Sequence, residues 1–177
     1  KRNTTNSIAG TYEISTGELV VEPDPFRDGA FILNVNGVPS SHLIPEEPRT
    51  LEFEYMRWIA AAVENLAPGK RLLHLGGGGC SLPRYFANLW PDSHNTVVEL
   101  DAKLAELIRE LAGIPSAPRV KIRAGEARAV TEGFPPNRFD VIIRDVFAGA
   151  ITPEPLTTEE FFQHAHATLS VSYTHLR

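Results

Sequence analysis

The sequence has little of what several common protein classes depend on. Its 177 residues include one cysteine, Cys80, so no disulfide framework is expected within the chain. No apolar run reaches the roughly 18 residues of a membrane-spanning helix, and the polar residues 1–6 do not form a signal peptide. The net charge of -5 provides no broad positive field for binding nucleic-acid phosphates. We therefore expect a cytoplasmic protein with a small-molecule partner, which binds neither nucleic acid nor membrane.

The residues that are present suit one compact domain with a small appendage. The hydrophobic share of 42% and the charged share of 22% are typical of globular proteins. In residues 1–49, β-prone runs flank Thr16-Gly17 and Asn36-Gly37, and Asn-Gly is a favoured hairpin turn. This pattern predicts a small antiparallel β-hairpin unit over residues 1–49.

Strand and helix signals alternate in residues 50–170. A helix is expected over 50–66, where apolar residues recur at helical spacing and Pro68-Gly69 follows. Strands are expected at 71–75, 96–100, 120–124 and 140–145, and further helices at 81–90, 102–112 and 158–167. This alternation predicts an α/β domain with a Rossmann-like parallel sheet covered on both faces, in the order third, second, first, fourth strand.

Four glycines, Gly76, Gly77, Gly78 and Gly79, join the first of these strands to its helix. Glycines there let the backbone approach a ligand closely and direct free helix N–H groups at it. The match to the dinucleotide fingerprint is incomplete, because Ser81 stands where the third glycine would be. On this motif alone, a nucleoside site and a simple tight turn both remain open.

Acidic residues end the second strand about twenty residues beyond the glycines, which is the spacing of a ribose-binding acid. Glu99 or Asp101 could accept hydrogen bonds from both ribose hydroxyls, or could cap the next helix. Asp101 is well placed as the N-cap of that helix. We therefore assign the ribose contact to Glu99.

The third and fourth strands also end in polar residues, Gly125-Glu126 and Asp145. Ligands of open α/β sheets bind beyond the carboxyl ends of the strands, so these groups are expected to face one crevice together with the glycines and Glu99. For Glu126 a solvated loop acid remains the alternative. For Asp145 the alternative is a helix or turn cap.

These segments resemble those of the polyamine synthase family, the spermidine synthases or aminopropyltransferases. The matching segments are the glycine signature Leu75-Gly76-Gly77-Gly78-Gly79-Cys80-Ser81-Leu82, the ribose motif Val98-Glu99-Leu100-Asp101, the motif Gly125-Glu126 and the catalytic strand at residues 139–145. The hairpins in front and the helix around Phe53 and Tyr55 resemble the family's N-terminal region. The likeness covers residues 10–169.

The resemblance implies a sheet of the S-adenosylmethionine-dependent methyltransferase type, preceded by the hairpin unit. It also implies a bound co-substrate, decarboxylated S-adenosylmethionine, or S-adenosylmethionine itself. The residues that would hold this nucleoside are Gly76, Gly77, Gly78, Glu99, Gly125 and Glu126, the last of them near the adenine.

The same resemblance implies a reaction, transfer of an aminopropyl group to a putrescine-like amine in polyamine biosynthesis. Asp145 would deprotonate the attacking amine, and Tyr55 would bind the amine substrate. No metal is expected. Members of the family are often dimers, which implies a homodimer.

The sequence departs from the family's pattern at several positions. Three acids of the family are absent: Arg57 and Gly79 stand at the positions of two of them, and no acid follows shortly after Asp145. The family's hairpin glutamine would fall at about Ser40. Cys80 and Ser81 replace glycines, and Glu126 replaces an aspartate. These changes leave open another nucleophile as acceptor. Residues 171–177 are interpreted as a non-native tail that follows a C-terminally truncated sheet.

Two further functions stay open. A methyltransferase would prefer a partner for the cofactor carboxylate, such as a backbone N–H or a basic group near the loop. Arg84, one turn into the helix after the glycines, could supply it or be solvated. A non-catalytic nucleoside-binding or dimerising module is the other, favoured by the absence of the family's acids.

Two single residues near the glycines are also considered. Cys80, at a helix N-terminus, could have a lowered pKa but has no clear base. His74 is expected to be a core histidine with its hydrogen bonds satisfied.

Overall fold

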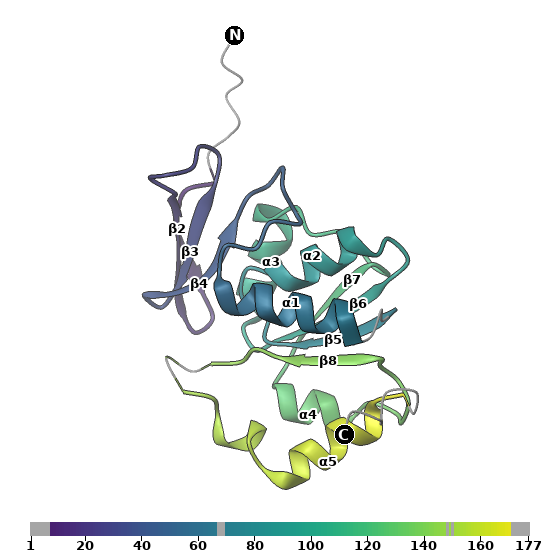
Figure 1. The fold of residues 1–177 in the computed structure, drawn as a ribbon. Helices are drawn as coiled ribbons and strands as arrows, with labels where there is room; N and C mark the ends of the chain where they lie inside the picture. Colours follow the sequence, from purple (N-terminus) through teal and green to yellow (C-terminus); the bar gives the residue numbers. More distant parts are fainter. Residues whose placement is uncertain (1–7, 67–69, 148, 150, 171–177) are drawn as a thin grey trace.

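The computed structural model describes residues 8–66, 70–147, 149 and 151–170. Residues 171–177, interpreted above as a non-native tail, lie outside this described part. Two β-sheets lie beside each other, and helices surround the second sheet (Figure 1).

The first sheet is the expected unit of β-hairpins. Its strands are β1 (Gly10–Ile14), β2 (Gly17–Pro23), β3 (Phe31–Val35) and β4 (Val38–Leu43). They pair antiparallel in chain order, which confirms the prediction. Asn36 and Gly37 have φ of 51° and 77°, the left-handed backbone that a type I′ turn requires.

The second sheet is parallel and Rossmann-like. Its strands are β5 (Arg71–Leu75), β6 (His94–Glu99), β7 (Val120–Ala124) and β8 (Val141–Arg144). Their spatial order is β7-β6-β5-β8 and each neighbouring pair is parallel. The expected order of third, second, first and fourth strand is therefore confirmed.

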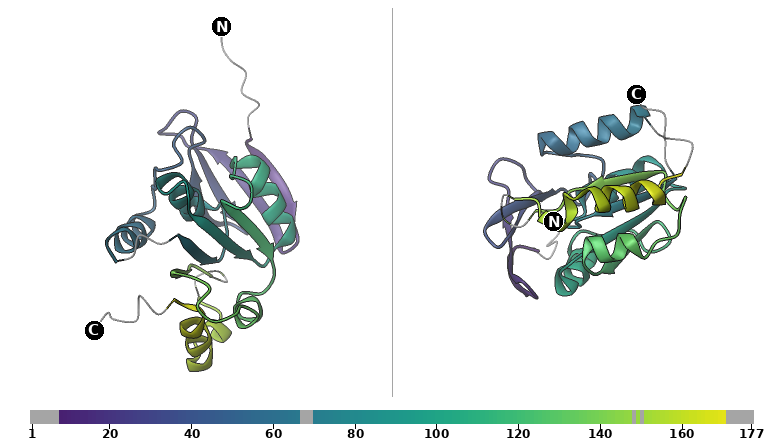
Figure 2. Two further views of the ribbon diagram at one scale, coloured as in Figure 1. Left: turned by 90° about the vertical axis from the view of Figure 1, so that its right-hand side faces the viewer. Right: turned by 90° about the horizontal axis from the view of Figure 1, so that it is seen from below.

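Helices cover both faces of this sheet. They are α1 (Glu54–Leu66), α2 (Ser81–Leu89), α3 (Ala102–Leu111), α4 (Ala127–Glu132) and α5 (Glu159–Thr168), with a 3-10 helix, η1, at Glu154–Leu156. Leu72 and Ile143 pack against α1 and α2, whereas Leu73 and Leu75 pack against α4 and α5. Figure 2 shows α1 and α4 on opposite sides of the sheet.

The structure differs from the sequence-based expectation in three elements. Helix α4 and the 3-10 helix η1 were not predicted. Helix α1 begins at Glu54 rather than at residue 50, because the preceding residues form turns. In these turns the N–H groups of Glu47 and Thr50 donate to the carbonyls of Ile44 and Glu47.

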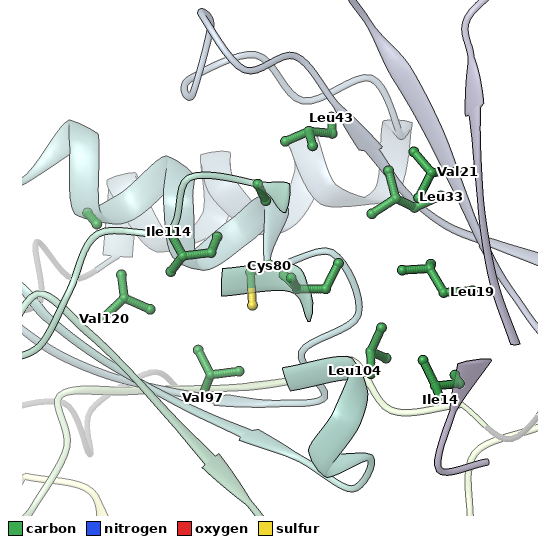
Figure 3. Close-up of a cluster of buried hydrophobic side chains, with 13 residues drawn as sticks. Ile14, Leu19, Val21, Leu33, Leu43, Cys80, Val97, Leu104, Ile114 and Val120 are labelled. Carbon is green, nitrogen blue, oxygen red and sulfur yellow. The ribbon is translucent and has the colours of Figure 1, made fainter. Parts of the chain in front are cut away.

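One hydrophobic cluster crosses between the two sheets (Figure 3). The hairpin unit contributes Ile14, Leu19, Val21, Leu33 and Leu43, and the second sheet with its helices contributes Cys80, Ala87, Val97, Leu104, Ile108 and Val120. Residues 1–49 and 50–170, which we propose as the two regions of the chain, therefore share a core. Among the described residues, no helix has the length and apolar character to cross a membrane.

Candidate functional site

The residues expected to form the site leave the parallel sheet side by side. Gly76, Gly125 and Asp145 are the first residues after β5, β7 and β8, and each donates its backbone N–H to the neighbouring strand. Glu99 is the last residue of β6, between β5 and β7. The structure thus brings the strand-end residues to one edge of the sheet.

The glycine loop approaches its neighbours too closely for side chains. Gly76 has a φ of +90°, and a Cβ there would lie 2.2 Å from the backbone oxygen of Asp145. A Cβ on Gly77 would lie 3.0 Å from Oε2 of Glu99. The loop therefore passes between Asp145 and Glu99 and presents backbone to both.

The Glu99 carboxylate is held by backbone donors. Its Oε2 accepts hydrogen bonds from the N–H groups of Gly77 at 2.9 Å and Gly78 at 3.1 Å, and its Oε1 accepts one from Asp101 N–H at 3.0 Å. A carboxylate offers about four acceptor positions. A ligand with two vicinal hydroxyls would take the remaining position and share or displace one backbone donor.

Asp101 caps α3, as expected, because its side chain accepts from the N–H of Leu104 at 2.9 Å. The sequence did not reveal its other partners, Ser15 and Thr16, which lie in the turn between β1 and β2. Burial opposes ionisation of Asp101, but the hydrogen bonds from Leu104, Ser15 and Thr16 outweigh it and hold its pKa at about 2.

Asp145 and Tyr55 lie in contact although they are far apart in the sequence. The phenol of Tyr55, on α1, donates to Oδ2 of Asp145 at 3.2 Å. Burial raises the pKa of Asp145, and the hydrogen bond from Tyr55 partly offsets that rise. Burial and the charge of Asp145 raise the pKa of Tyr55, so the phenol keeps its proton.

A small cavity adjoins this pair. Its volume is about 20 Å³, and its lining includes Asp145, Gly76 and Gly77, with Met56 of α1 and Ser81 at the start of α2. A cavity of this size accommodates roughly one water molecule. The cavity beside the glycine loop and Asp145 is therefore too small for a nucleoside.

Gly125 and Glu126 follow the end of the third strand, as expected, and the exposed carboxylate of Glu126 also has a structural role. It caps α4 by accepting hydrogen bonds from the N–H groups of Arg128 at 2.9 Å and Ala129 at 2.8 Å. The sequence does not reveal this cap, because the six residues of α4 are too few to show a helical period. The cap fixes Glu126 at the same sheet edge as Glu99.

Two arginines near the site have structural roles that the sequence did not predict. Arg84 is 5% exposed and donates to the carbonyls of Ile44 at 3.2 Å and Pro45 at 3.0 Å, so a solvated Arg84 is wrong. Arg57, at a position where the family has an acid, donates to the carbonyls of Leu51 and Glu52. Both side chains hold the segment that leads into α1 and Tyr55.

Cys80 is buried behind the loop and is not an activated thiol. Burial and the charge of Glu99 raise its pKa to about 12, although nearby arginines lower it. The expected effect of a helix N-terminus is therefore overridden by desolvation.

His74 is a core residue, as expected, but only one ring nitrogen is paired. Its Nε2 lies 2.9 Å from Oδ1 of Asn95, while its buried Nδ1 has no hydrogen-bond partner. Burial lowers the pKa of His74 to about 4, so the ring is neutral near pH 7.

A larger hollow of about 700 Å³ lies elsewhere, between β8 and α5, and is lined by Ile142, Arg144, Phe161, Phe162 and His166 among others. It contains none of the residues expected to bind a nucleoside or an amine. Within the described part of the chain, no group of three His, Cys, Asp or Glu side chains could hold a metal ion.

The chain was compared with family models, curated proteins and solved structures. No family model matches the sequence. Over 130 residues the chain is 30% identical to a polyamine aminopropyltransferase of Vibrio vulnificus, an alignment that covers 72% of this chain and 43% of that protein.

Solved structures with a similar arrangement include spermidine synthases. A probable spermidine synthase from Corynebacterium glutamicum is 53% identical with a TM-score of 0.87, covering 93% of this chain and 61% of the other. A spermidine synthase in complex with the transition-state analogue AdoDATO is 23% identical with a TM-score of 0.72, covering 91% and 54%, and shows the shared fold. The chain thus spans 43% to 61% of the length of these three proteins.

Proposed function

Because the chain belongs to the polyamine aminopropyltransferase (spermidine synthase) family, we propose that the complete protein transfers an aminopropyl group from decarboxylated S-adenosylmethionine to a small amine. One observation carries the proposal. The glycine loop passes between Glu99 on one side and the Asp145–Tyr55 pair on the other, at one edge of the sheet. A nucleoside on this loop would have one acid beside its ribose and another beside its reactive end.

In this proposal the nucleoside is bound mainly by backbone and Glu99. Gly76, Gly77 and Gly78 let the loop approach the ligand, and Glu99 accepts from the ribose hydroxyls. Gly125 and Glu126 lie at the next strand end, where the adenine would extend. Leu100, which follows Glu99, is 64% exposed and offers an apolar surface for the base.

The amine half of the reaction depends on Asp145 and Tyr55. A neutral amine attacks the carbon attached to the sulfonium, the C–S bond breaks, and the nucleoside leaves as a neutral thioether. The amine loses a proton as the C–N bond forms, and the carboxylate of Asp145 accepts it. Its raised pKa suits this role, since a base of very low pKa accepts protons poorly.

The position of Arg84 removes one side chain that would have favoured S-adenosylmethionine over the decarboxylated nucleoside. A methyltransferase would prefer a backbone N–H or a basic group near the loop as partner for the cofactor carboxylate, and Arg84 is the basic side chain that the sequence offers. Its guanidinium is instead buried against the carbonyls of Ile44 and Pro45. The identity of the amine as putrescine-like and the homodimer remain predictions from the family.

The test is a transfer assay on the complete protein with decarboxylated S-adenosylmethionine and putrescine. Asp145→Asn should leave nucleoside binding nearly unchanged and lower kcat about a hundredfold or more, because an amide neither accepts the proton nor attracts the ammonium. Asp92→Asn, on an exposed loop, is the matched control and should behave as the parent.

Other outcomes lead to other functions. Transfer at the parental rate in Asp145→Asn would make Asp145 a structural residue and refute the mechanism. A parent that binds S-adenosylmethionine more tightly than its decarboxylated form would favour a methyltransferase. A parent that binds no nucleoside would favour a non-catalytic, dimerising module.

A further inference from the structure

We propose that the N-terminal hairpin unit is part of the nucleoside site, because its first turn positions Glu99 through Asp101. Thr16 and Asp101 are then positioning residues for the ribose contact. This inference rests on the proposed role of Glu99 and adds the residues that set its geometry.

The first contact joins the hairpin unit to Asp101. In the turn between β1 and β2, the N–H of Ser15 donates to Oδ1 of Asp101 at 3.0 Å. The N–H and the hydroxyl of Thr16 donate to Oδ2 at 2.6 Å and 2.8 Å. With the bond from Leu104, the buried carboxylate has four donors, so its position is fixed on both sides.

The second contact joins Asp101 to the site. The backbone N–H of Asp101 donates to Oε1 of Glu99, whose Oε2 accepts from Gly77 and Gly78. A displacement of Asp101 would therefore remove the donor that orients Oε1 of Glu99. Thr16 is thus connected to the glycine loop through two carboxylates.

The turn itself is braced by the second hairpin. Asn36 accepts from the N–H of Glu18 at 3.0 Å and donates to the carbonyl of Thr16 at 3.2 Å. A Cβ on Gly17 would lie 2.0 Å from the Asn36 oxygen, so the two turns are in close contact. The Asn36 side chain therefore braces the turn that holds Asp101.

The hairpin unit also contacts the glycine loop directly. Oγ of Ser41, on β4, accepts from the N–H of Gly79 at 2.8 Å, and Ser41 is 1% exposed. A Cβ on Gly79 would lie 2.4 Å from the Ser41 Cβ. The unit therefore supports the loop from behind while Asp101 supports Glu99, and a preorganised acceptor loses less entropy when a ligand binds.

The experiment is a double-mutant cycle on the complete protein, with binding measured by calorimetry. Thr16→Val removes the hydroxyl donor to Asp101. Thr11→Val is the matched control, because Thr11 is exposed on β1 and its side chain makes no hydrogen bond to the other described residues. The ligands are methylthioadenosine and its 2′,3′-dideoxy analogue. Each protein is compared with and without Glu99→Gln, and unfolding midpoints are recorded for all.

The relay predicts that Thr16→Val weakens methylthioadenosine binding about three- to tenfold, as expected for one hydrogen bond. Thr11→Val should have no effect, the dideoxy analogue should bind parent and Thr16→Val equally, and the loss should vanish in the Glu99→Gln background. Asp101→Asn, which keeps the shape of the side chain, should weaken binding more than Thr16→Val.

Two results would overturn the relay while leaving the ribose contact intact. One is parental affinity in both Thr16→Val and Asp101→Asn when Glu99→Gln alone binds weakly. The other is an equal loss for both ligands or in both backgrounds, since that would reflect general destabilisation. Parental affinity in Glu99→Gln alone would instead refute the ribose contact, and the relay with it.

Discussion

Asp145 and Tyr55 are the two residues whose protonation the proposed transfer depends on. Burial raises the pKa of Asp145, while the Tyr55 hydrogen bond stabilises the carboxylate and lowers it. In Tyr55→Phe this stabilisation is lost, so the pKa of Asp145 rises further and the base is protonated over a wider range. The acid limb of the pH profile of kcat/KM should then move to higher pH. The control is Tyr85→Phe, because the hydroxyl of Tyr85 donates to Glu64 instead of Asp145. An unmoved limb, or one at lower pH, would show that Asp145 is not the titrating base.

Residue positions followed from the sequence where they depend on strand ends. Glu99 and Asp145 were placed correctly at the sheet edge, because the carboxyl ends of parallel strands lie together. The buried position of Arg84 could not be predicted, since its partners, Ile44 and Pro45, lie about forty residues earlier, in the segment between β4 and α1. The cap by Glu126 was missed for a different reason, because it depends on a helix of two turns.

At the scale of elements, the glycine loop is where the fold leaves least room. Gly76→Ala combines a φ of +90° with a Cβ only 2.2 Å from the Asp145 carbonyl oxygen. We expect it to lower the free energy of unfolding by about 2–4 kcal/mol and to weaken nucleoside binding. The control is Gly133→Ala, where φ is -83° and the new Cβ would meet nothing closer than 3.5 Å. Chemical denaturation should show a change within about 1 kcal/mol for the control; equal stabilities for the two variants would contradict this geometry.

The elements themselves were predicted with uneven success. The strands at residues 71–75 and 120–124 agree to the residue, because a charged residue precedes each strand and a glycine follows it. Helix α4 was missed because six residues, Ala127–Glu132, are too few to show a helical period. The start of α1 was placed too early, since Leu51 continues the apolar spacing of the helix although residues 50–53 are not helical.

At the scale of the whole molecule, the hairpin unit and the parallel sheet share one hydrophobic cluster. Leu33 is 1% exposed in it, whereas both tryptophans, Trp58 and Trp90, lie outside the hairpin unit. Leu33→Ala should lower the unfolding free energy reported by tryptophan fluorescence by about 2–5 kcal/mol. Val38→Ala, on the exposed side of the same hairpin at 43% exposure, should change it by less than about 0.5 kcal/mol. A tryptophan transition unaffected by Leu33→Ala would mean that the two regions unfold independently.

The sequence predicted both regions but not how they are joined. Hairpin turns and alternating strand and helix signals are local patterns, whereas the Asp101 contacts with Ser15 and Thr16 join residues 85 or more positions apart. The shared cluster likewise depends on which face of the first sheet meets α2 and α3. Such contacts arise from tertiary packing and leave no periodic signal in the chain.

The central claim is that the loop and Glu99 bind a nucleoside that lacks the cofactor carboxylate, and calorimetry on the complete protein tests it most directly. Affinities for decarboxylated S-adenosylmethionine, S-adenosylmethionine and methylthioadenosine would be measured for the parent, Glu99→Gln and Glu126→Gln. We predict that the parent prefers the decarboxylated form. We also predict that Glu99→Gln weakens its binding about ten- to hundredfold, as for a lost bond to a charged group, and that Glu126→Gln weakens it less. Equal affinities in all three proteins, or no nucleoside binding by the parent, would contradict the account.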